Sequence, residues 1–90
     1  MSIQSKKSPL NLIEIPLTVL SVNESGDVVH ITAGVKATHR LSGLGITIGT
    51  PIKILSRAPF RGPVQIEVRN TRLAIGRGLA QKILVHKNLD

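Results

Sequence analysis

The side chains that could do chemistry are three histidines and five carboxylates. The histidines are His30, His39 and His86, and the carboxylates stand at positions 14, 24, 27, 67 and 90. A protein metal site needs at least three converging ligands, and no histidine here has the HxH, HxxxH or HxxE spacing that would supply them. We therefore expect no metal site and no cofactor. Weak divalent metal binding is the alternative, if a helix with His39 packs over a strand with His30.

Catalytic patterns are missing as well. The carboxylates are scattered and form no spaced acid–base pair, and no nucleophile stands with a recognisable base. Gly76-Arg77-Gly78 lacks the Gly-Lys-Ser/Thr ending of a phosphate-binding loop. We predict that the protein is not an enzyme.

Length and composition predict one small folded domain. The chain has 90 residues, 41% of them hydrophobic. It has no cysteine, which excludes a disulfide scaffold and a zinc ribbon and fits the cytoplasm. No apolar run approaches the ~20 residues that span a bilayer, and the stretch 10–20 lacks the features of a signal peptide. We expect a cytoplasmic protein.

The charge is strongly basic and uneven. Twelve Lys and Arg against five Asp and Glu give a net charge of +7, most of it in the second half of the chain. This predicts an acidic partner, which could be nucleic acid, an anionic membrane surface or an acidic protein face. Phe60 is the only aromatic residue, so stacking on single-stranded bases has almost no platform. Arg57, Arg61, Arg69, Arg72 and Arg77 flank neighbouring strands. In one interpretation they are ordinary solvated surface, and in the other they form a single basic face that docks on an acidic protein surface.

These residues need a scaffold, and the pattern is that of short strands separated by turns. Strands are predicted over 17–22, 27–33, 51–57, 64–69, 73–75 and 83–86, with a helix over 36–44 and a single helical turn over 79–82. In the turn at 23–26, Gly26 is expected to provide positive φ. Residues 1–13 are predicted to be a flexible tail, and 14–90 a mainly β domain: a small barrel of five to six short strands with one short inserted helix.

The ordered set of motifs resembles one family. Arg40-Leu41-Ser42-Gly43-Leu44-Gly45-Ile46-Thr47-Ile48-Gly49-Thr50 resembles the FeoA signature, an Arg-Leu helix that ends in Leu-Gly before a Gly turn into a strand. Ala58-Pro59-Phe60-Arg61-Gly62-Pro63 and Thr71-Arg72-Leu73-Ala74-Ile75 follow in the family's order, and the resemblance covers residues 16–86. Two departures are Ser42 and Gly43, where the family has bulkier residues. Their small side chains would open a surface depression or loosen the helix.

The resemblance implies a fold and a function. The fold would be an SH3-like barrel, as in the C-terminal domain of DtxR-type iron-dependent repressors. The function would be that of a non-catalytic, cytoplasmic accessory protein of ferrous iron uptake, which binds and modulates the FeoB-type membrane transporter. The residues predicted to bind this partner are Arg40, Leu41, Leu44, Arg69, Arg72 and Arg77.

Three alternatives stay open. The first is a small basic barrel that binds nucleic acid, and the second is a metal-sensing module that uses His30 and His39. Leu41 and Leu44 are core contacts of the helix in one interpretation, and they border an SH3-like groove for a partner peptide in the other. A homodimer is an alternative to the monomer.

Overall fold

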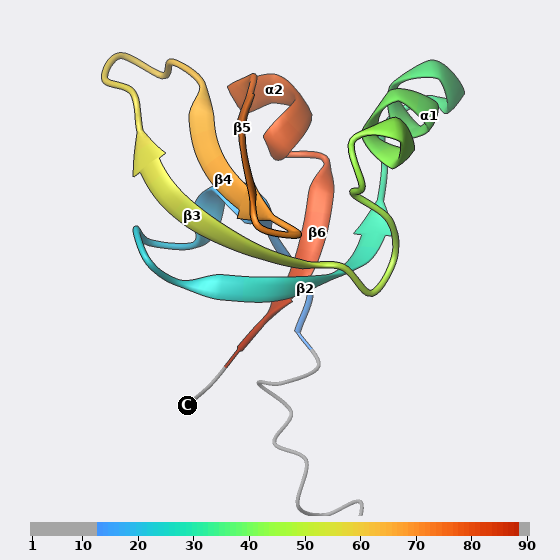
Figure 1. Ribbon diagram of the computed structural model, residues 1–90, viewed down its shortest axis with the longest axis horizontal. Helices are drawn as coiled ribbons and strands as arrows, with labels where there is room; N and C mark the ends of the chain where they lie inside the picture. The colour runs from blue at the N-terminus through green and yellow to red at the C-terminus, as the bar shows by residue number, and fades with distance from the viewer. Residues whose placement is uncertain (1–12, 89–90) are drawn as a thin grey trace, which may run out of the picture.

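A computed structural model describes residues 13–88, so the predicted tail over 1–13 lies outside the described residues except for Ile13. Six strands and two α-helices follow one another, with one 3-10 turn near the start (Figure 1). Their order is β1 (Ile15–Pro16), η3 (Leu17–Val19), β2 (Ser25–Ile31), α1 (Val35–Gly43), β3 (Pro51–Arg57), β4 (Val64–Val68), β5 (Thr71–Ile75), α2 (Arg77–Ala80) and β6 (Ile83–Lys87).

The strands form one antiparallel sheet in the order β1-β6-β2-β3-β4-β5. Register shifts interrupt β2 between Val28 and His30 and β3 between Ile54 and Ser56. Such bulges bend a strand and increase its twist, so the sheet curls around its concave face (Figure 1). The short helix α2 and the turn η3 contact each other. The mainly β, SH3-like architecture predicted from the sequence is confirmed.

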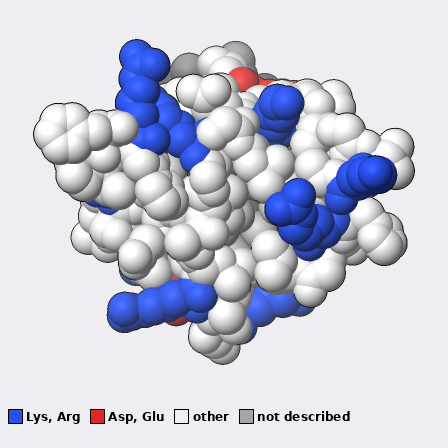
Figure 2. Space-filling model, turned by 90° about the horizontal axis from the view of Figure 1, so that it is seen from above, with Lys and Arg blue, Asp and Glu red and all other residues white. Residues whose placement is uncertain are grey.

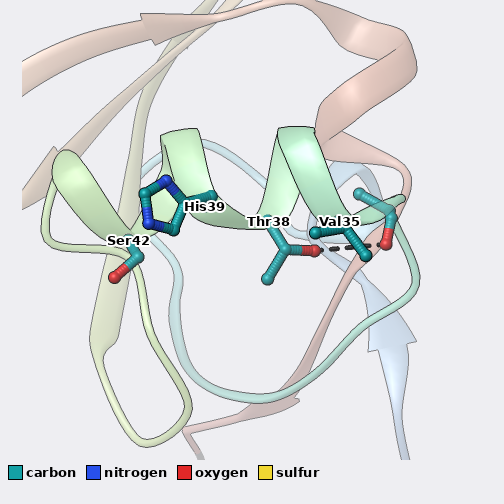
Figure 3. Close-up of a pocket in the computed structure, with 5 residues that line it drawn as sticks. Val35, Thr38, His39 and Ser42 are labelled. Atoms are coloured by element: carbon teal, nitrogen blue, oxygen red, sulfur yellow. Dashed lines mark hydrogen bonds between the residues drawn. The ribbon is translucent and has the colours of Figure 1, made fainter.

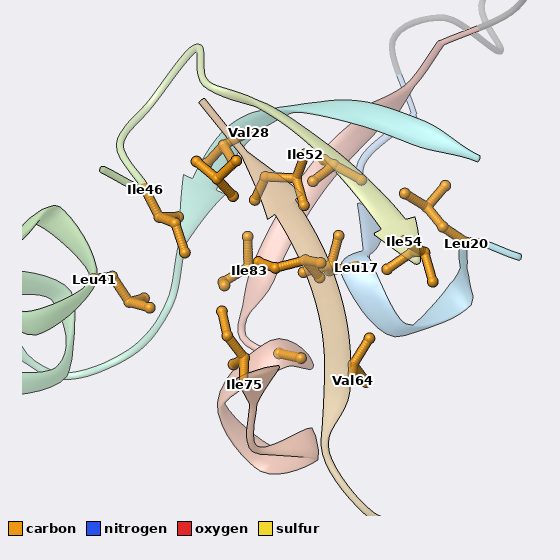
Figure 4. Close-up of a cluster of buried hydrophobic side chains, with 14 residues drawn as sticks. Leu17, Leu20, Val28, Leu41, Ile46, Ile52, Ile54, Val64, Ile75 and Ile83 are labelled. Carbon is orange, nitrogen blue, oxygen red and sulfur yellow. The ribbon is translucent and has the colours of Figure 1, made fainter. Parts of the chain in front are cut away.

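The core fills the concave face of this sheet (Figure 4). The alternation predicted in β4 holds, because Val64, Ile66 and Val68 are buried between more exposed neighbours. Ile52 and Ile54 of β3 are also fully buried, as are Ile83 and Val85 of β6. Aliphatic side chains therefore make up the whole core, and the only aromatic residue of the chain lies outside it.

The strand predicted over 17–22 is wrong. Leu17–Val19 forms a 3-10 turn, which places Leu17 and Leu20 on one side and buries both. Residues i and i+3 of a 3-10 helix eclipse each other, whereas a strand would send them to opposite faces. Val19 and Val22, which look like strand residues, are exposed. The spacing of the two leucines therefore decides the local structure.

The turn before β2 also differs from the prediction. Its left-handed residue is Asn23, at φ 73°, and Gly26 lies within β2. Gly26 is needed there because a Cβ atom would come within 2.7 Å of the His86 carbonyl oxygen and 2.9 Å of Val85 Cγ2. Glycine thus allows β2 and β6 to approach closely.

Helix α1 ends in a Schellman motif, as the Gly45 position suggested. The Ile46 N–H donates to the Leu41 carbonyl at 2.9 Å, and the Gly45 N–H donates to the Ser42 carbonyl at 2.9 Å. Gly45 takes φ 90°, which glycine adopts without a steric penalty. Leu41 and Ile46 are both fully buried, so the end of the helix is fixed against the core.

Candidate partner-binding site

Helix α1, which follows β2 and precedes β3 in the chain, projects from the sheet (Figure 1). Two hollows that share lining residues lie along it. The first, of about 420 Å³, is lined by Ala33, Val35, Thr38, His39 and Ser42 (Figure 3). The second, of about 380 Å³, is lined by His30, Ile31, Thr38, Ser42, Ile46, Thr47 and Ile48. Thr38 and Ser42, one helical turn apart, line both hollows. The small side chain of Ser42 thus accompanies a surface depression, one of the two consequences expected from the sequence.

We call these two hollows, together with Leu44, the α1 surface. It carries large apolar side chains that the core does not use. Val35 is 87% exposed, Ile48 63% and Leu44 46%. Single exposed apolar residues are ordinary, but Val35 and Ile48 each line an apolar hollow, and a surface of this kind is typical of partner binding. Val35 and Ile48 were missed by the sequence analysis, because an exposed aliphatic residue has the same sequence signal as a buried one.

The residues predicted on the helix face two ways. Leu41 is fully buried and packs α1 onto the core, so it offers no surface to a partner. Leu44 is half exposed at the end of the helix, and Arg40 is exposed in its last turn. The core interpretation therefore holds for Leu41, and the groove interpretation is compatible with Leu44.

The two candidate metal ligands line different hollows. His39 lies in the first and His30 in the second, where its Nδ1 is 3.9 Å from the Glu14 carboxylate. Within residues 13–88, no three His, Cys, Asp or Glu side chains are grouped closely enough to hold a metal ion. The helix therefore does not bring His30 and His39 into a site with a third ligand.

Arg69, predicted to bind a partner, is exposed and also braces the connection between α1 and β3. Its Nε donates to the Gly45 carbonyl at 3.2 Å, and its Nη2 lies 3.5 Å from Thr50 Oγ1. Thr50 is buried, and its hydroxyl accepts the Thr47 N–H at 3.2 Å and donates to the Gly45 carbonyl at 3.3 Å. The brace fixes the loop that presents Ile48.

The five arginines of the expected basic face are divided between two ends of the sheet. Arg57 pairs with Val64, which pairs with Ile75, so Arg57, Arg61 and Arg77 lie near one end. Arg72 pairs with Glu67, near the β4–β5 turn that holds Arg69. Val64 and Val68 are four residues apart, or roughly 13 Å along a strand. Figure 2 accordingly shows separate groups of basic side chains on the face it views.

Acidic side chains are missing from the middle of the chain. Between Asp27 and Glu67 the sequence has no Asp or Glu but contains Lys36, Arg40, Lys53, Arg57 and Arg61. This stretch includes α1 and the loop that joins β3 to β4, whereas Glu67 in β4 lies opposite Lys53 in the sheet. Both features therefore present positive charge without a neighbouring carboxylate in their own sequence, which favours an acidic partner.

Away from these surfaces, one ion pair joins the residue before β2 to the last residue of β6. Lys87 Nζ lies 2.7 Å from the Glu24 carboxylate, which also accepts the Ser21 N–H at 2.8 Å. The hydrogen bond from Lys87, followed by that from Ser21, lowers the pKa of Glu24. Both bonds favour the charged carboxylate. The pair joins the start of β2 to the end of β6 and does not contribute to the α1 surface.

Comparison with known proteins agrees with this architecture. The FeoA domain model matches residues 15–87. The candidate Fe(2+) transport protein A of Methanocaldococcus jannaschii is 41% identical over 70 residues, which cover 78% of this chain and 83% of that protein. The crystal structure of the iron uptake regulatory protein FeoA superposes with a TM-score of 0.76 at 36% identity, over 84% of this chain and 99% of that one.

The fold recurs in a larger protein. A manganese-dependent transcriptional repressor has a TM-score of 0.76 at 21% identity, over 83% of this chain and 42% of the repressor. At that identity the likeness shows the fold alone. No helix within residues 13–88 has the length and apolar character needed to cross a membrane. By the match of its domain model and its 41% identity to a relative, the chain belongs to the FeoA family, which is associated with ferrous iron transport.

Proposed function

We propose that this protein is a non-catalytic accessory of ferrous iron uptake, which works in the cytoplasm without a cofactor and binds the cytoplasmic part of a FeoB-type transporter. Membership of the FeoA family supports the link to iron transport. The observation that carries the binding role is the α1 surface, where the exposed side chains of Val35 and Ile48 line two apolar hollows and Leu44 is half exposed at the end of the helix. Docking of a partner segment into an apolar groove is a recurrent mode of peptide recognition, although these hollows lack the aromatic lining of peptide-binding SH3 domains.

Charge and rigidity support the same surface. Lys36 and Arg40 are exposed on α1, and the neighbouring sequence has no carboxylate, so an acidic apolar segment would be attracted. The Schellman motif and the Arg69 brace hold the helix end and the loop in place. A surface that is fixed before binding loses little conformational entropy when the partner docks.

The test is an NMR titration of the labelled protein with the cytoplasmic domain of the transporter from the same organism, at moderate salt. We expect saturable shifts at Val35, Ser42 and Ile48. Val35→Asp and Ile48→Asp should each weaken binding on the order of tenfold or more, because each puts a charge into an apolar contact. Val19→Asp is the matched control, since Val19 is 60% exposed but does not line either hollow.

Two outcomes would redirect the proposal. If a short DNA duplex binds and the transporter domain does not, the nucleic-acid alternative replaces it. The affinity for DNA should then fall steeply with added salt. If Fe²⁺ binds and His39→Ala removes that binding, a metal-sensing role replaces it. Unchanged transporter binding in both Asp variants would show that the partner docks elsewhere.

A further inference from the structure

The loop between β3 and β4 has a conformation that its sequence does not favour. We call Ala58–Pro63 the hairpin tip. The Gly62 N–H donates to the Pro59 carbonyl at 3.1 Å, which closes a turn with Phe60 and Arg61 at its centre. These two residues take φ 57° and 62°, as in a type I′ turn. That turn favours Asn and Gly, because a Cβ atom is crowded at positive φ.

The strained turn displays the single aromatic ring of the chain. Phe60 is 98% exposed. The next most exposed large apolar side chains of residues 13–88, Val35 and Ile48, are aliphatic and smaller. Pro59 and Pro63 stiffen the loop, and the Ala58 N–H donates to the Pro63 carbonyl at 3.1 Å. Residues with a strained backbone conformation cluster at functional sites, where the strain holds a side chain in the position that function requires. The tip is thus rigid, and it projects from the upper edge of the sheet (Figure 1).

Basic side chains flank the ring. Arg57 and Arg61 are exposed on either side of it, and the tip itself contains no carboxylate. Within residues 13–88, the ion pairs involve His30 and Lys87 and neither of these arginines. The tip therefore combines an apolar ring with two arginines that form no ion pair with any carboxylate of residues 13–88.

We propose that the hairpin tip inserts Phe60 into the interface of an anionic lipid bilayer, with Arg57 and Arg61 against the lipid phosphates. A specific protein interface buries about 800 Å² on each partner, and a convex tip of six residues offers too little surface for that. A bilayer requires no matching shape, and it gains from a buried ring together with neighbouring basic residues. The net charge of +7 draws the whole molecule toward an anionic surface.

The composition of the chain makes this inference directly testable. The protein has no Trp and no Tyr, so Phe60→Trp introduces a single fluorophore at the tip. We expect its emission to shift to the blue when vesicles containing about a third phosphatidylglycerol are added, and not with phosphatidylcholine alone. Since one ring and two arginines bind weakly, the titration extends to lipid concentrations on the order of millimolar.

Substitutions in the unlabelled protein give the second measurement, by co-sedimentation with the same vesicles. Phe60→Ala should lower partitioning by about tenfold or more, and Arg57→Gln or Arg61→Gln by about fivefold each. The matched controls are Val19→Ala and Arg72→Gln, which remove an exposed apolar and an exposed basic side chain outside the tip. Val19→Ala should partition within about twofold of the wild type. Arg72→Gln should lose less partitioning than Arg61→Gln, because its charge lies outside the tip.

The proposal is overturned if the tryptophan emission does not move with anionic vesicles, or if Arg72→Gln costs as much as Arg61→Gln. It is also overturned if Phe60→Ala weakens binding to the transporter domain and leaves vesicle binding unchanged, because the tip would then dock on that protein. Vesicle binding requires neither the transporter nor the α1 surface. This proposal and the proposed function can therefore fail separately.

Discussion

Replacing the strained pair at the hairpin tip should stabilise the protein. In the double variant Phe60→Asn/Arg61→Gly, each left-handed position receives a residue that tolerates positive φ. A non-glycine residue in this region costs about 1 kcal/mol or more, and Gly returns part of the gain through the larger entropy of the unfolded chain. Phe60 is 98% exposed, so removing its ring forfeits almost no burial. The net expectation is a gain of about 1–2 kcal/mol.

Urea unfolding followed by circular dichroism measures this gain. The midpoint should rise with an unchanged slope, because the surface exposed on unfolding is the same. A matched control in the same loop is Gly62→Ala, which should destabilise the protein because a Cβ atom there would lie 2.7 Å from Ala58 Cβ. An unchanged or lower midpoint in the double variant would show that the left-handed pair is not strained, and the argument from strain to function would fall.

Three further perturbations test the packing and the ion pair. Gly26→Ala should lower the free energy of unfolding in urea by about 2 kcal/mol or more, because the new methyl group meets the His86 carbonyl. A urea midpoint equal to that of the wild type would contradict the close approach of β2 and β6. Leu41→Ala should cost about 2–4 kcal/mol and broaden the NMR signals of α1, because it leaves a cavity under the helix. Lys87→Met should raise the pKa of Glu24 toward its ordinary value in a carboxyl NMR titration. Because folding lowers the pKa of Glu24, the pair stabilises the protein at pH values above the unfolded-state pKa. This stabilisation is lost as the pH falls through the folded-state pKa. The variant lacks the pair, so it should lose less stability in acid than the wild type.

Local patterns were enough to predict the elements whose signals are local. The bounds of β3 were predicted without error, and the inserted helix was placed within one residue. Gly45 and Gly49 both take positive φ, and so does Asn70, a residue type that tolerates this conformation better than most. In each case the residue type itself indicates that the backbone takes a positive φ, so the prediction needed no information about the tertiary structure.

Features that depend on distant parts of the chain could not be predicted. Leu17 to Val22 has strand-forming residues, and only the position of the core shows that Leu17 and Leu20 must face the same way. Arg69 meets Gly45 across 24 residues of sequence, which no periodicity can indicate. The division of the basic residues into two groups follows from strand register, and the register is set by turns and bulges rather than by the charges themselves.

The strand order also dictates when the chain can fold. β6 pairs with β1 on one side and with β2 on the other, so the last strand to be synthesised is required to connect the first strand to the rest. On a ribosome, the β3–β4–β5 meander can form as soon as it emerges, because its pairings are local. The first strand must wait, with the apolar side chains around it uncovered, until β6 arrives. Delayed closure of this kind leaves apolar surface exposed on the growing chain, and exposed apolar surface is what makes incompletely folded chains prone to aggregate.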